Sequence, residues 1–208
     1  MTSFIITRVK FVLDLFYNAC IEQSDEHLKE ADILLFCHDA NRNTIFGSKA
    51  YSPLIDSLRN EFELLGYKCQ SIANVGSRLT GDKAYGHPIS FNRKYFLAFI
   101  KENLFFKKNA RTKLFKQILS ITKAKLIITI GSPINLALAA HEKGVFHVEV
   151  LHGIGYTKVA FGWDNQRKEL LPQGLLSLDK ISTKSFSPLF DNGKNIKTIP
   201  HPFLRRFV

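Results

Sequence analysis

The sequence predicts one α/β domain with a doubly wound, mostly parallel, Rossmann-like sheet and helices on both faces. Two stretches, residues 32–73 and residues 125–151, support this prediction. Each contains a strand pattern, a helix pattern and a second strand pattern, and a strand–helix–strand unit pairs its two strands in parallel. The 208 residues favour a single domain over positions 1–208.

The first unit follows a helical segment near the N-terminus. Apolar residues at helical spacing over 4–20 predict an amphipathic helix, which could pack on the core or lie on a membrane surface. An apolar run at 32–37 predicts a buried strand. A helical pattern then starts at Pro53 and ends at Gly66, and alternation over 67–72 predicts the second strand.

A predicted loop and a basic stretch connect the two units. Residues 74–90 hold four glycines or prolines, which predicts a long loop. Residues 91–125 carry ten lysines and arginines but only one acid, Glu102, with aromatic residues between them. This pattern predicts one or two amphipathic helices broken near Asn109. Their basic face is either simply solvated or binds a phosphorylated or lipid-linked partner.

The second unit and the segments after it continue the alternation. They are, in order, a strand at 125–130, a helix at 134–143, a strand at 145–151, a short strand at 175–178, a helical piece near 182–190 and a strand at 196–199. Gly131 and Pro133 would turn the chain into the first of these helices, and Gly144 would end it.

Candidate site residues follow the predicted strands, because open parallel sheets bind ligands at the carboxyl ends of their strands. They are His38, Asp39, Gly131, Ser132, His152, Gly153 and His201. His152 is the catalytic candidate, since an imidazole titrates near neutral pH and can accept a proton from a hydroxyl. Three of these residues also have a structural interpretation. His152 could be a strand-end histidine with no chemical role, Asp39 could cap a loop, and His201 could stiffen a turn.

Charge and missing motifs limit the function classes. The formal net charge is +11, with 29 basic and 18 acidic residues, which favours anionic partners such as nucleic acid, anionic lipid or phosphorylated sugars. The sequence contains no glycine-rich dinucleotide or P-loop motif, no hydrolase elbow and no zinc motif, so we predict no cofactor and no metal. Three cysteines without a CxxC pair favour a reducing cytoplasm.

Several short motifs together indicate a family. They are residues 51–56, 131–133, 135–140, 143–145, 148–154, 155–164, 171–179 and 199–202. This set resembles bacterial surface-polysaccharide glycosyltransferases of the GT-B type, which build capsule or lipopolysaccharide. In that family a strand often ends in a Gln-His-Gly or similar triplet, and here residues 151–153 read Leu-His-Gly. The likeness covers mainly residues 125–203. GT-B enzymes have two Rossmann-like domains, so we expect this chain to be the N-terminal, acceptor-side half.

The resemblance implies transfer of a sugar from a nucleotide-activated donor to a glycan or lipid-linked acceptor. It makes His152 the general base on the acceptor hydroxyl, or a group that steadies the departing phosphate. Gly131 and Ser132 would line the site through backbone N–H groups, while His38 and Asp39 would contact the acceptor. The expected partners are a C-terminal GT-B domain and an anionic membrane surface. The expected location is the cytoplasm, with peripheral binding to the inner membrane left open.

Two other classes compete with this prediction. The net charge and the lysine–phenylalanine interleaving of 91–125 would suit a nucleic-acid-binding protein, although no helix-turn-helix, zinc or RNP signature is present. A domain that only docks partners is the third class. The isolated half could also lack activity of its own. An enzyme needs the strand-end His-Gly pair and the glycine-lined edge at one place, whereas a nucleic-acid binder does not.

Overall fold

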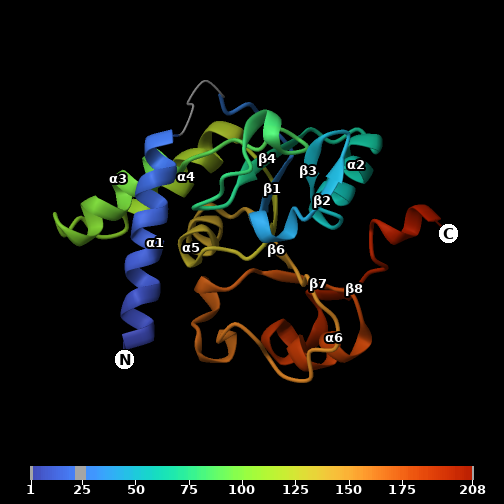
Figure 1. The fold of residues 1–208 in the computed structure, drawn as a ribbon. Coiled ribbons are helices and arrows are strands. Elements are labelled where there is room, and N and C mark those ends of the chain that lie inside the picture. Colours follow the sequence, from blue (N-terminus) through green and yellow to red (C-terminus); the bar gives the residue numbers. More distant parts are fainter. Residues whose placement is uncertain (1, 22–26, 208) are drawn as a thin grey trace.

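A computed structural model describes residues 2–21 and 27–207. Its centre is a sheet of six parallel strands in the order β4-β1-β5-β6-β7-β8 (Figure 1). The strands are β1 (Ile33–Cys37), β4 (Cys69–Ala73), β5 (Leu126–Ile130), β6 (Phe146–Val150), β7 (Gly174–Ser177) and β8 (Ile196–Thr198). The predicted α/β fold with a Rossmann-like parallel sheet is confirmed.

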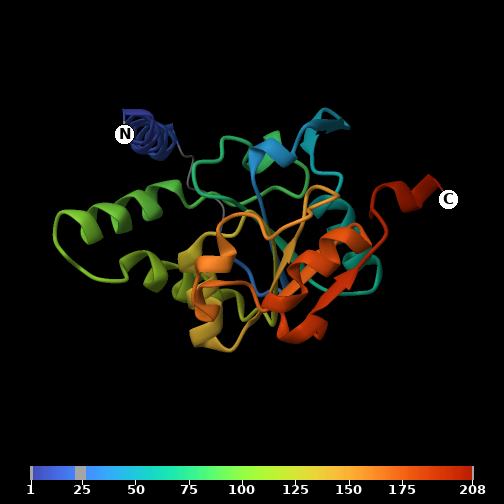
Figure 2. The same ribbon diagram turned by 90° about the horizontal axis from the view of Figure 1, so that it is seen from below.

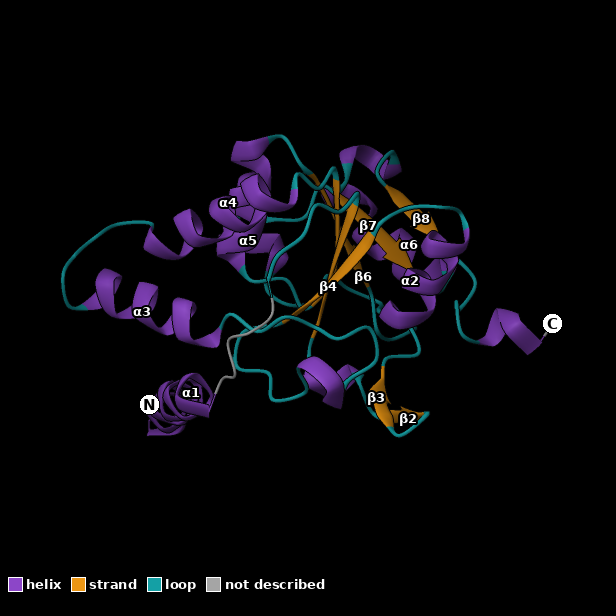
Figure 3. Ribbon diagram, turned by 90° about the horizontal axis from the view of Figure 1, so that it is seen from above, coloured by secondary structure: helices purple, strands orange, loops and turns teal. Residues whose placement is uncertain are grey.

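Helices cover both faces of this sheet (Figure 3). The helices of the molecule are α1 (Thr2–Ile21), α2 (Ile55–Leu64), α3 (Asn92–Asn103), α4 (Ala110–Thr122), α5 (Ile134–Lys143) and α6 (Lys180–Phe186). Of these, α1 packs mainly on α3, at the side of the sheet. Successive residues of β1 point to opposite faces. Leu34 therefore packs in a core with α4 and α5, while Leu35 packs in a second core with α2. Among the described residues, no helix is long and apolar enough to cross a membrane.

The chain reverses its direction across the sheet between β1 and β5. From β1 it moves outward to β4, crosses back, and then adds β5, β6, β7 and β8 in sequence on the other side. Cys37 pairs in register with Ala73 of β4 and with Ile130 of β5. The residues that follow these three strands therefore leave the sheet at one level. This edge, between β1 and β5, is the switch point at which open α/β sheets bind ligands.

Most predicted elements form within a few residues of their expected bounds. The break near Asn109 separates α3 from α4, and Asn109 itself has a left-handed φ of +63°. One element was missed: β2 (Thr44–Phe46) and β3 (Lys49–Tyr51) form an antiparallel hairpin outside the main sheet. Gly47 and Ser48 both have positive φ, as a two-residue hairpin turn requires, so their Gly-Ser pair was the available signal.

A buried ion pair anchors the connection from β1 to α2. The Arg42 guanidinium donates a hydrogen bond of 2.6 Å to the Asp56 carboxylate, and the two side chains are 1% and 0% exposed. The same carboxylate oxygen accepts from the backbone N–H of Ser52 at 2.7 Å, and Arg42 also donates to the carbonyl of Tyr85 at 3.2 Å. The pair thus joins the base of the β2–β3 hairpin, the start of α2 and the loop before α3.

Candidate functional site

Two residues meet at the switch point, one from each flanking strand. His38 follows β1 and Gly131 follows β5. The His38 ring lies directly over Gly131: a Cβ atom added at position 131 would lie 2.4 Å from His38 Cδ2 and 2.7 Å from His38 Nε2. Gly131 also has a φ of +78°, which L side chains rarely adopt. Glycine at this position is therefore required both by the backbone and by the approach of the imidazole.

A second imidazole comes from the neighbouring strand. His152 follows β6, is exposed, and its ring centroid lies 6.1 Å from that of Phe161. Partial burial of the ring lowers the pKa of His38 below its ordinary value, the nearby His152 lowers it further, and Asp39 opposes both effects. His38 and His152 follow β1 and β6 at the same edge of the sheet, with β5 between these two strands. A lowered pKa favours the neutral form of His38, which can accept a proton.

The loop that carries His152 is held by α6. Asp179 caps this helix by accepting from the backbone N–H of Ser182 at 2.9 Å. The other Asp179 oxygen accepts from the N–H of Gly155 at 3.0 Å, and the Ser182 hydroxyl accepts from the N–H of Tyr156 at 3.1 Å. The Ser182 hydroxyl also donates to Asp179 at 2.6 Å, and this bond, followed by the backbone bonds from Ser182 and Gly155, lowers the pKa of Asp179. His152 is therefore positioned at both ends, by β6 before it and by α6 after it.

The backbone N–H groups of Gly131 and Ser132 are already occupied. Both donate to the carboxyl group of Glu149, which lies on β6 and is 4% exposed. The expectation that these N–H groups face an external anion is therefore wrong, because an internal carboxyl group takes that place. Glu149 was missed at the sequence level. The available signal was its position two residues after His147 in a strand predicted to be buried. Residues two apart in a strand lie on the same face, so two ionisable side chains share a buried face.

A buried polar chain runs from Glu149 to His147. The Thr129 hydroxyl donates to the second Glu149 oxygen and lies 2.9 Å from His147 Nε2. When Glu149 is ionised, the Thr129 hydrogen points to its carboxylate, and the Thr129 oxygen then accepts from His147 Nε2–H. His147 Nδ1 has no partner among the described residues. Burial raises the pKa of Glu149 to about 7 and lowers the pKa of His147 to about 3, so His147 is neutral.

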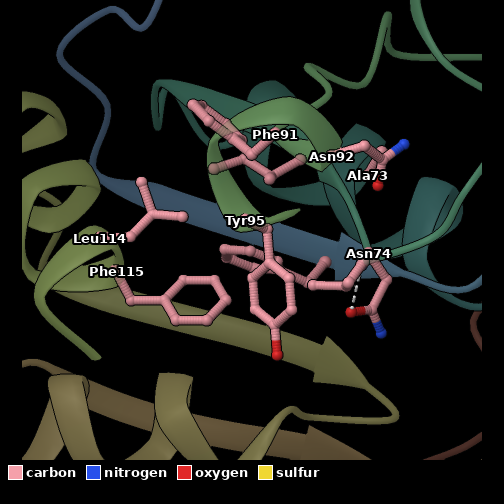
Figure 4. Close-up of a pocket in the computed structure, with 10 residues that line it drawn as sticks. Ala73, Asn74, Phe91, Asn92, Tyr95, Leu114 and Phe115 are labelled. Atoms are coloured by element: carbon pink, nitrogen blue, oxygen red, sulfur yellow. Dashed lines mark hydrogen bonds between the residues drawn. The ribbon is translucent and has the colours of Figure 1, made fainter. Parts of the chain in front are cut away.

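Asn74 ties the end of β4 to the same edge. Its side-chain amide donates to the carbonyl of Gly131 at 2.8 Å. Figure 4 shows Asn74 beside Tyr95 and Phe115 at a cavity between the α3–α4 helices and the sheet. The cavity has a volume of only about 10 Å³, which is room for one water molecule at most. This cavity is therefore a packing gap. The candidate site lies at the carboxyl edge of the sheet.

Two further predicted residues do not join His38 and His152. Asp39 accepts from the backbone N–H of Arg78 at 2.7 Å, and its other oxygen is shielded from solvent without a partner among the described residues. Its capping interpretation is therefore the one that the structure favours, and direct contact with an acceptor is not. His201 follows β8, which lies two strands beyond β6 in the sheet. Two residues later, the ring of Phe203 packs on that of Tyr51, with the ring centroids 6.2 Å apart. No described hydrogen bond or ring contact links His201 to either imidazole.

Gly153 lies next to the catalytic candidate His152 and leaves room for the side chain of Tyr156 to approach the loop backbone. A Cβ atom at this position would lie 3.0 Å from the Tyr156 hydroxyl oxygen. The ring of Tyr156 in turn packs against Phe161 and Phe186, at centroid distances of 5.9 Å in both cases. Gly153 therefore lets this aromatic cluster support the loop, which is a structural role next to His152.

Comparisons with known proteins assign no family to the chain. No family model matches it, and no curated protein matches it. Among residues 2–21 and 27–207, no group of three or more histidine, cysteine, aspartate or glutamate side chains could hold a metal ion. What the protein does must be inferred from the parallel sheet, from the residues at the switch point and from the motifs of residues 125–203.

Proposed function

We propose that this domain is the acceptor-side half of a GT-B type glycosyltransferase, which transfers a sugar from a nucleotide-activated donor to a glycan or lipid-linked acceptor. The observation that carries the proposal is the position of two histidines at the carboxyl edge of a parallel sheet, with His38 after β1 at the switch point and His152 after β6, two strands away. The Leu-His-Gly triplet at the end of β6, which resembles the family's motif, supplies one of them. The chemistry of the transfer requires a proton acceptor at that place.

In the proposed reaction the oxygen of an acceptor hydroxyl attacks the anomeric carbon of the donor sugar. The new glycosidic bond forms, the bond from that carbon to the diphosphate oxygen breaks, and the nucleoside diphosphate leaves with the electron pair. His152 takes the proton of the hydroxyl group. The lowered pKa of His38 favours its neutral form, which reduces repulsion when His152 becomes charged. Its ring is placed to orient the same hydroxyl.

The leaving diphosphate needs positive charge from elsewhere. Glu149 occupies the N–H groups of Gly131 and Ser132, so the start of α5 does not serve the diphosphate. In the GT-B arrangement that the motifs resemble, the donor is held mostly by the second domain. We therefore assign acceptor binding and proton transfer to this chain, and donor binding to a C-terminal domain.

Replacing His152 with alanine is expected to lower the rate of sugar transfer by about 100-fold or more, because a positioned general base contributes at least that much. The measurement uses the longest native form of the protein, a panel of radiolabelled nucleotide-sugars and a lipid and glycan extract as acceptor. His141→Ala is the matched control, since His141 is an exposed histidine near the end of α5. Undiminished transfer in His152→Ala would contradict the proposal, as would the absence of transfer by the wild type with every donor.

A further inference from the structure

The connection between α3 and α4 exposes three consecutive large apolar side chains. Leu104, Phe105 and Phe106 are 64%, 66% and 84% exposed, and we call them the apolar tip. Figures 2 and 3 show that the α3–α4 hairpin extends away from the sheet, with the tip at its far end. Single exposed apolar residues are common on protein surfaces, but a contiguous group marks an interaction surface.

The hairpin holds the apolar tip in place. The backbone N–H of Arg111, at the start of α4, donates to the Glu102 carboxylate at 2.8 Å, and the guanidinium pairs with the other oxygen of the same carboxylate. The guanidinium also lies over the rings of Tyr95 and Phe99, at 5.9 and 5.7 Å. Phe106 has a φ of +51°, an unfavourable conformation for an aromatic residue. The helices are thus clamped together just behind the tip, and the tip projects outward.

Unpaired positive charges surround the apolar tip. Lys101, Lys107 and Lys108 are exposed, and none of them pairs with an acidic side chain among the described residues. The single acid of the hairpin, Glu102, is neutralised by Arg111. The tip therefore combines exposed apolar side chains with three nearby lysines, so a partner must bind both apolar and positively charged groups.

Exposed apolar side chains continue from the tip along the hairpin toward the sheet. Leu97 lies seven residues before Leu104, on the same face of α3, and is 52% exposed. The neighbouring helix α1 packs on α3, where the ring of Phe16 lies 5.5 Å from that of Phe96. On α1, Leu13, Phe16 and Tyr17 are each more than half exposed.

We infer that the α3–α4 hairpin anchors the protein to an anionic lipid bilayer. The apolar tip enters the interface between headgroups and acyl chains, and the three lysines extend to the lipid phosphates. Duplex nucleic acid would use the lysines but would leave the apolar tip in water, whereas a bilayer satisfies both. This inference goes beyond the proposed function and does not depend on it, because it concerns binding alone.

The test is sedimentation of the purified chain with vesicles of phosphatidylcholine mixed with phosphatidylglycerol, compared with phosphatidylcholine alone. We expect tight binding only to the anionic vesicles, weakened by salt. The double variant Phe105→Ser/Phe106→Ser is expected to lower the partition coefficient by about tenfold or more, since two rings no longer leave water. Lys107→Glu/Lys108→Glu is expected to lower it by at least about fivefold for each lysine.

A matched control comes from the opposite side of the fold. Leu64 and Leu65, at the end of α2, are 82% and 72% exposed, so Leu64→Ser/Leu65→Ser removes similar apolar surface elsewhere. This control is expected to bind like the wild type. Both serine variants change exposed positions, and thermal unfolding checks that each remains folded. Three results would overturn the inference: no binding to anionic vesicles, equal binding by the tip variant and the wild type, or equal losses in the tip variant and the control.

Discussion

Replacing Asp56 with alanine is expected to lower the free energy of unfolding by about 3–5 kcal/mol, because it leaves a buried charge without its partner. The Arg42 and Asp56 side chains are 1% and 0% exposed, so the Arg42 guanidinium could not regain water without opening the fold. The Ser52 N–H would also lose its acceptor. Burial raises the pKa of Asp56, and the Arg42 charge offsets only part of that rise. Denaturant unfolding followed by circular dichroism measures the loss.

A double replacement tests whether the stability lost in Asp56→Ala comes from the unpaired charge of Arg42. Arg42→Met/Asp56→Leu removes both charges and fills the space with apolar atoms, so it is expected to recover most of the stability lost in Asp56→Ala. Glu30→Ala serves as the control, because it breaks the exposed pair of Glu30 with Lys123 and is expected to change little. If Asp56→Ala and Glu30→Ala had equal effects, the account of this connection would be wrong.

Replacing Glu149 with alanine is expected to cost about 3 kcal/mol of stability and to loosen the turn at the switch point. The change would leave the backbone N–H groups of Gly131 and Ser132 without their acceptor and would remove one acceptor of the buried Thr129 hydroxyl. Glu149→Gln keeps an acceptor oxygen and is expected to lose less. Hydrogen exchange at the Gly131 and Ser132 amides reads out the turn directly, and unchanged exchange in Glu149→Ala would contradict the assigned contacts.

The stability should also depend on pH through Glu149. Burial raises its pKa from the ordinary 4.5 to about 7, so the folded state holds the proton more tightly than the unfolded state. This contribution is fully present below about pH 4.5 and is lost as the pH rises through about 7. His147 acts in the opposite sense, since its lowered pKa costs stability as the pH falls below 6.5. The difference between the wild type and Glu149→Gln over pH 4–8 isolates the Glu149 contribution.

The fold was predictable because its signals are local. The apolar run of β1, the proline and glycine at the two ends of α2, and the αL glycine after α5 each mark an element by the residues within it. The β2–β3 hairpin was missed although its Gly47-Ser48 turn was visible, because each strand has only three residues and its apolar pattern is too short to stand out.

The candidate site was only partly predictable. The rule that ligands meet the carboxyl ends of parallel strands led to His38 and Gly131, which the structure places against each other, and to His152, which leaves the same edge two strands away. The same rule could not show what occupies the N–H groups after β5, because the Glu149 carboxyl group reaches them from a neighbouring strand in the sheet. Contacts between strands depend on register, and register follows from the packed sheet rather than from any single segment.

The proximity of the two imidazoles at the carboxyl edge of the sheet is tested most directly by the pKa of His38, measured by NMR titration of its ring protons. In the wild type this pKa is expected to lie below the ordinary 6.5 of histidine, and in His152→Gln it is expected to rise, because one of the influences that lower it is removed. An equal His38 pKa in both would contradict the account, because the two rings would then not share one site.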